Sequence, residues 1–165
     1  AASVILALMA LFGVLLDTPS IEAVTEGPGE IETTETEQPD APAGGVTLDI
    51  SSVSSDVLEF AQDSITVSAG DEVVLKFQNN ATIQQHNWVL VQAGTKDDVA
   101  VAGMAASSTG WIPVDDERVL AYVDLISPGE SGLAIFTAPA PGTYQFVCTF
   151  PGHNLTMFGT FEVSP

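Results

Sequence analysis

One cysteine, one histidine and one methionine lie close together near the end of the chain, and their side chains could hold a soft metal. Cys148, His153 and Met157 follow one another with the spacing C-x4-H-x3-M, and the only other histidine is His86. Two imidazoles, a thiolate and a weak axial thioether are the ligand set of a blue-copper electron-transfer site. Because this set uses the only cysteine and both histidines, few ligands remain for a rival metal chemistry.

A strand and a tight turn must bring these ligands together. The run Tyr144–Cys148 alternates like a strand, so we expect Cys148 where the chain leaves a sheet. Pro151-Gly152 favours a turn that returns His153 toward the sulfur, and Met157 can then approach from one side. This loop supplies three ligands, and the second imidazole has to come from elsewhere in the sheet.

His86 opens the apolar run 86–92 after a polar turn, a position suited to the open end of a sandwich. We expect it to be the deeper imidazole and His153 to be the edge through which an electron leaves. The side-chain amide of Asn87 could bond to the Cys148 loop and orient the thiolate. The Phe150 N–H is free to donate toward sulfur, whereas Pro151 has none. Fewer donors to the thiolate favour a higher reduction potential.

Eight short apolar or β-branched runs with turn signals between them predict the fold of residues 46–165. This number of strands in about 120 residues indicates an all-β Greek-key sandwich of seven to eight strands. The stretch Asp97–Ser107 predicts one short helical insertion. The predicted strands are Val46–Ile50, Ile65–Ser68, Glu72–Gln78, His86–Gln92, Leu120–Asp124, Gly132–Thr137, Thr143–Cys148 and Gly159–Val163.

Two segments with contrasting composition precede this domain. Residues 1–16 carry no charge, and a helix of that length spans about 24 Å against a hydrocarbon core of roughly 30 Å. We expect a membrane anchor that is incomplete at its N-terminus; a signal-peptide core and a buried helix are the alternatives. Residues 17–45 hold eight acids and no base, with several prolines, threonines and glycines. That composition predicts a disordered, flexible acidic linker.

The charge balance excludes some partners. Three basic residues face 22 acidic ones, which gives a formal net charge of -19. Such a field repels nucleic acid and anionic lipid surfaces, so we expect no nucleic-acid partner. It favours a protein partner with a basic docking face, although acidic surfaces also simply maintain solubility.

At the two ligand segments the chain resembles the cupredoxins, and within them the azurin and auracyanin branch. The resemblance is carried by Cys148-Thr149-Phe150-Pro151-Gly152-His153 with Met157, and by His86-Asn87-Trp88-Val89-Leu90. It implies a cupredoxin β-sandwich with one type 1 copper ion held by His86, Cys148, His153 and axial Met157. In azurin a glycine at the position before His86 places its backbone carbonyl near copper. In this chain the residue is Gln85, so a weak contact from the Gln85 carbonyl to copper is a possible fifth contact.

The apolar segment and acidic linker are similar to those of the membrane-tethered auracyanins of photosynthetic bacteria. This resemblance implies a location on the extracytoplasmic (periplasmic) face of the cell membrane. It also implies a quinol-oxidising membrane complex as electron donor and a reaction-centre cytochrome as acceptor. We expect neither an enzyme activity nor a small-molecule substrate.

Other copper chemistries need more ligands than the chain offers. A second catalytic copper generally needs further histidines, and a binuclear centre needs two cysteines. A copper carrier or chaperone remains the alternative function, although only Met104 and Met9 are left as further thioethers. Zinc could occupy the same pocket but has no redox chemistry. Met104, Ala105, Trp111 and Phe150 are predicted to form a small apolar docking face near His153.

Overall fold

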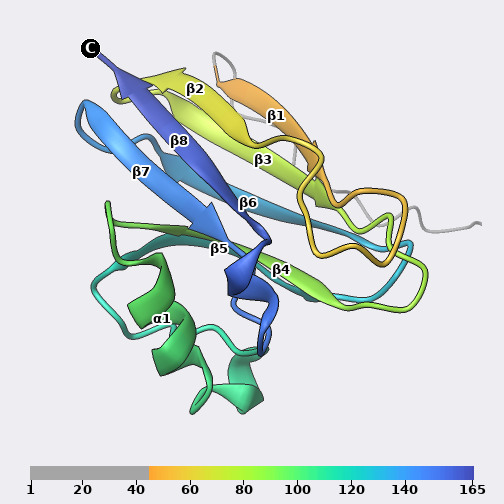
Figure 1. The fold of residues 1–165 in the computed structure, drawn as a ribbon. Coiled ribbons are helices and arrows are strands. Elements are labelled where there is room, and N and C mark those ends of the chain that lie inside the picture. The colour runs from red at the N-terminus through yellow and green to blue at the C-terminus, as the bar shows by residue number, and fades with distance from the viewer. Residues whose placement is uncertain (1–44) are drawn as a thin grey trace, which may run out of the picture. The chain divides into compact units, whose positions relative to one another are not determined.

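The computed structural model describes residues 45–165, which form two packed β-sheets (Figure 1). The anchor predicted for 1–16 and the linker predicted for 17–45, apart from Gly45, lie outside the described residues. The elements in chain order are β1 Val46–Ser51, β2 Ser64–Ser68, β3 Glu72–Gln78, β4 His86–Val91, α1 Lys96–Gly103, η1 Ser107–Thr109, β5 Val119–Ile126, β6 Ser131–Thr137, β7 Gly142–Val147, η2 His153–Leu155 and β8 Phe158–Ser164.

The strand order confirms the predicted sandwich. One sheet has the order β1-β3-β6, and the other has the order β2-β8-β7-β4-β5. Strands β1 and β3 are parallel, as are β2 and β8, while the remaining pairs are antiparallel. Strands that are neighbours in a sheet are therefore often distant in sequence, as expected for Greek-key connections. All eight predicted strands are found, and their ends agree with the prediction or differ from it by at most two residues.

Strand β4 is buried along its whole length because both of its faces are covered. Trp88 and Leu90 belong to the main core between the sheets. Val89 and Val91, which alternate with them, pack in a second cluster with Val99 of α1 and with Ile112 and Val147. The insertion between β4 and β5 thus covers the outer face of the five-stranded sheet beside the end of β7 (Figure 1).

The helix is shorter than the predicted Asp97–Ser107. It begins at Lys96 and ends at Gly103, where its hydrogen bonds tighten from the α-helical to the 3-10 pattern. Met104 N–H donates to the Val101 carbonyl and Ala105 N–H to the Ala102 carbonyl, each three residues back. The chain then turns into the separate 3-10 helix η1. Within residues 45–165, no helix has the length and apolarity needed to cross a membrane.

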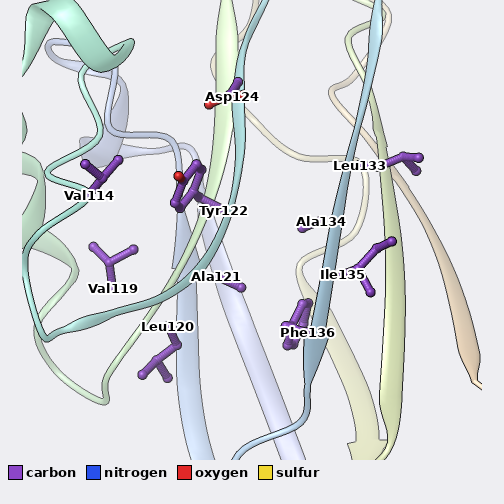
Figure 2. Close-up of a pocket in the computed structure, with 10 residues that line it drawn as sticks. All are labelled: Val114, Val119, Leu120, Ala121, Tyr122, Asp124, Leu133, Ala134, Ile135 and Phe136. Atoms are coloured by element: carbon purple, nitrogen blue, oxygen red, sulfur yellow. The ribbon is translucent and has the colours of Figure 1, made fainter. Parts of the chain in front are cut away.

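A shallow groove runs along the side of the sandwich where β5 and β6 are the outer strands of their sheets (Figure 2). Tyr122 and Ile135 are partly exposed there, and Phe136, which packs against the main core, also lines the groove. None of the lining residues is a predicted metal ligand.

The close contact between β7 and β8 generates a stability prediction. Gly159 lies opposite Phe146, and a Cβ atom at this position would lie 2.2 Å from the Phe146 ring and 2.7 Å from the Asp63 carbonyl oxygen. Gly159→Ala should therefore lower the free energy of unfolding by roughly 1–3 kcal/mol, as overpacked core sites do. The measurement is denaturant unfolding of the metal-free protein. Gly142→Ala is the control, because its Cβ would make ordinary contacts of 3.6 Å or longer. Equal midpoints for the two variants would contradict the close packing.

Candidate metal centre

The loop after β7 is closed by its own backbone. Cys148 is the first residue beyond the strand, and its N–H donates to the Met157 carbonyl at 3.0 Å. Met157 N–H donates to the His153 carbonyl at 2.8 Å, and His153 N–H donates to the Phe150 carbonyl at 2.9 Å. Gly152 reverses the chain with φ of 83°, a conformation that glycine adopts without a steric penalty. Three predicted ligands are thereby brought to one place.

The register of two strands brings His86 to the same place. Strands β4 and β7 are antiparallel, and Val89 lies opposite Val147. Residues that precede Val89 therefore lie beside residues that follow Val147, so His86 reaches the loop that begins with Cys148. This proximity spans more than sixty residues of sequence.

Three possible ligand atoms face one another. His86 Nδ1 lies 3.2 Å from His153 Nδ1. Cys148 Sγ lies 3.9 Å from His86 Nδ1 and 3.6 Å from His153 Nδ1. All three residues are buried, His86 more completely than His153. An ion bound at about 2.0–2.3 Å from each ligand requires ligand atoms no more than about 4.6 Å apart, and these separations meet that limit. The residues therefore fit one metal ion.

Burial keeps the three groups uncharged at neutral pH. Burial and the neighbouring His153 lower the pKa of His86 to about 4, although Asp56 opposes this shift. Burial also lowers the pKa of His153. Burial raises the pKa of the Cys148 thiol to about 12, against the smaller effect of the backbone N–H groups of Asn87 and Phe150. Both imidazoles can thus offer a lone pair, whereas the thiol must lose a proton before it binds a metal.

The side chain of Asn87 links β4 to the ligand loop. Its Oδ1 accepts the N–H of Thr149 at 2.8 Å, and its Nδ2 donates to Thr149 Oγ1 at 2.9 Å. Nδ2 also donates to the Gly110 carbonyl at 2.9 Å, which ties in the chain beyond η1. The amide therefore bonds to the residue next to Cys148, where the sequence suggested a link to this loop.

Sequence reasoning missed one group that acts on the sulfur. The backbone N–H groups of Asn87 and Phe150 both lower the pKa of the Cys148 thiol, and the local sequence suggested only that of Phe150 as a donor. Nothing in the local sequence identifies the Asn87 N–H, because it comes from a strand sixty residues away. Thr149 and Gly110 were missed for the same reason.

Met157 and Gln85 differ in their surroundings. Met157 is fully buried and packs in the same cluster as Cys148. Gln85 is exposed, and its side chain reaches Ser127 Oγ at 3.5 Å. The axial role of Met157 and the backbone contact from Gln85 stay predictions.

Comparison with known protein sequences identifies the family. Residues 46–164 match the family described as copper binding proteins, plastocyanin/azurin family. Auracyanin-A of Chloroflexus aurantiacus is 39% identical over 125 residues, which cover 74% of this chain and 76% of auracyanin-A. Auracyanin-B of the same organism is 46% identical over 118 residues, 67% of this chain. Those residues span about half of that relative, 49% of its length.

Solved structures give the same result, and the predicted cupredoxin relationship is confirmed. The structure of auracyanin A, described as a "blue" copper protein from Chloroflexus aurantiacus, aligns with a TM-score of 0.69 and 40% identity over 73% of this chain and all of that one. Reduced auracyanin from Roseiflexus castenholzii aligns with a TM-score of 0.70 and 34% identity over 74% of this chain and all of that one. The chain therefore belongs to the copper-binding plastocyanin/azurin family of blue copper electron carriers, and its cofactor is one type 1 copper ion.

Proposed function

We propose that the protein carries single electrons through a copper ion held by His86, Cys148 and His153, with Met157 as the weak axial ligand. The observation that carries this assignment is that two imidazole nitrogens and the only thiol lie within 4.8 Å of one another in a buried position. When bound, copper supplies the one-electron change between Cu(I) and Cu(II). No bond of a substrate is made or broken, and we propose no small-molecule substrate and no enzyme activity.

The residues of the chain contribute rigidity. Cu(I) and Cu(II) prefer different geometries, so ligands that move little between the two states keep the reorganisation small. Cys148 and Met157 are joined through the backbone, and Asn87 fixes the start of β4 to the loop.

We propose that electrons pass through the edge of His153. Its ring packs against Phe150 with centroids 4.7 Å apart, and Phe150 meets Trp111 edge to face at 6.0 Å. Met104 and Leu155 are 63% and 74% exposed. We propose that these side chains, with the predicted neighbour Ala105, form an apolar face on which a protein partner docks briefly.

The proposed donor is a quinol-oxidising membrane complex, and the proposed acceptor is a reaction-centre cytochrome. The supporting observation is the similarity to two auracyanins of known structure, both described as coming from photosynthetic bacteria. Residues 46–165 contain fourteen acidic and three basic residues. This negative charge favours protein partners with a basic docking face, and we propose no nucleic-acid partner.

We further propose that the domain works at the extracytoplasmic (periplasmic) face of the cell membrane, anchored by residues 1–16 and extended by residues 17–45. A relative whose name places it at a membrane, outer membrane protein H.8 of Neisseria gonorrhoeae, is 37% identical over 113 residues. The uncharged composition of residues 1–16 is the second supporting observation.

Proton release tests the ligand set. At pH 7 both imidazoles are neutral and the Cys148 thiol is protonated, so binding of one copper ion should release about one proton. Near pH 4 His86 also takes up a proton, and the number released should rise. The measurement is titration of the metal-free protein in weakly buffered solution. Release of no proton, or of two or more at pH 7, would contradict the assignment.

Two substitutions test the roles of the sulfur ligands. Cys148→Ser should abolish the visible thiolate-to-copper absorption, because serine offers no thiolate. Met157→Leu should keep the colour and raise the reduction potential, because loss of the thioether disfavours Cu(II). Absorption spectra and voltammetry measure both. A blue Cys148→Ser variant would refute the assignment. A colourless wild-type protein that passes Cu(I) to an acceptor would favour a copper chaperone instead.

Removal of the N-terminal segment tests the proposed anchoring. The full chain should float with lipid vesicles, whereas a variant that begins at Val46 should stay in solution with an unchanged absorption spectrum and potential. Vesicle flotation followed by spectroscopy is the measurement. Equal flotation of both proteins would disprove the anchor, and loss of copper binding on truncation would mean that the N-terminal residues help to build the domain.

A further inference from the structure

Lys96 holds an unusual place for a basic residue in this chain. It is one of only three bases, against 22 acids, and it stands at the first position of α1. A positive charge at a helix N-terminus opposes the helix dipole, whereas Asp97 and Asp98 in the same turn favour it. The side chain of Lys96 is nevertheless only 15% exposed. Contacts outside the helix must therefore stabilise this position.

The contacts outside α1 are with Asn154 of the ligand loop, residues 148–157, and with Phe158 at the start of β8. Lys96 Nζ donates to Asp97 Oδ1 at 2.7 Å and to the Asn154 carbonyl at 3.4 Å. It also lies 4.2 Å from the centre of the Phe158 ring, a cation–π contact. Asn154 Nδ2 donates to the same Asp97 oxygen at 3.0 Å, which completes the cluster.

The two residues outside α1 that Lys96 contacts each follow a proposed ligand in the sequence. Asn154 directly follows His153, and Phe158 directly follows Met157. The helix that carries Lys96 is itself fixed, since Val99 and Ala100 are buried and Gly94 N–H donates to Gln145 Oε1 of β7 at 3.0 Å. One ammonium group therefore joins a fixed helix to both sides of the turn that presents two ligands.

We propose that Lys96 is a positioning residue that clamps the ligand loop against α1, and that its fixed positive charge raises the reduction potential of the copper site. This inference rests on the proposed function. A nearby positive charge disfavours Cu(II), the more highly charged state, and a charge that is mostly buried is screened less by salt than an exposed one. Asp97 acts with the opposite sign, and at 65% exposure salt screens its effect more strongly.

Charge variants of the full copper-loaded chain test the electrostatic part by voltammetry at low and high salt. Lys96→Met should lower the potential at both salt concentrations, since it removes the cation and keeps an unbranched side chain over Phe158. Asp97→Asn should raise the potential, by an amount that shrinks at high salt. The control is Lys76→Met, which removes an equal charge from β3 outside the loop contacts and should shift the potential less. An unchanged potential in Lys96→Met, or shifts of the same sign in Lys96→Met and Asp97→Asn, would overturn the proposal.

Hydrogen exchange in the metal-free protein tests the clamp without copper. The N–H groups of Thr156 and Met157 both donate to the His153 carbonyl within the loop. Lys96→Met should speed their exchange, while Lys76→Met should leave it as in the wild type. Equal exchange in wild type and Lys96→Met would refute the clamp. A wild-type protein with no reversible copper couple would defeat the proposed function instead, and the exchange result would still decide whether Lys96 holds the loop.

Discussion

Two imidazole nitrogens and a thiol sulfur lie 3.2 to 3.9 Å apart where water has little access, and the rest of the structure has to maintain this crowding. Hydrogen bonds among these three groups depend on which ring nitrogens carry protons, so the side chains alone do not fix the arrangement. Burial also disfavours charging either ring. The backbone therefore fixes the positions of the ligands. The register of β4 and β7 places the imidazole of His86, and backbone hydrogen bonds within the loop place the other three proposed ligands.

Strand β4 performs two structural tasks at once. Its inward residues Trp88 and Leu90 fill the main core, and its outward residues Val89 and Val91 support the insertion that contains α1. The same strand begins with His86 and Asn87 at the metal site. A strand packed on both faces shifts little, because dense packing leaves no room for small displacements. Rigidity of the site thus follows from the position of β4 inside the sheet and beneath the helix.

Two of the three basic residues of this acidic domain, Lys96 and Arg118, pair with carboxylates around the insertion. Arg118 pairs with Asp116, and Lys96 pairs with Asp97. The carboxyl of Asp97 has a lowered pKa because it accepts hydrogen bonds from Lys96 and from Asn154. Surface ion pairs usually contribute little stability, so the place of Lys96 is better explained by what it touches than by its pair with Asp97. It is less exposed than Arg118 and contacts the ligand loop.

The sequence alone determined the ligand types and the fold class. The spacing of Cys148, His153 and Met157 is local, and the alternation of the strands is local as well, so both could be read from neighbouring residues. Only the tertiary structure decided which atoms meet. The side-chain amide of Asn87 on Thr149 and Gly110, and Lys96 on the ligand loop, both join distant segments. Such contacts depend on strand register and on where a helix docks, because these set the final few ångströms between groups that no local pattern relates.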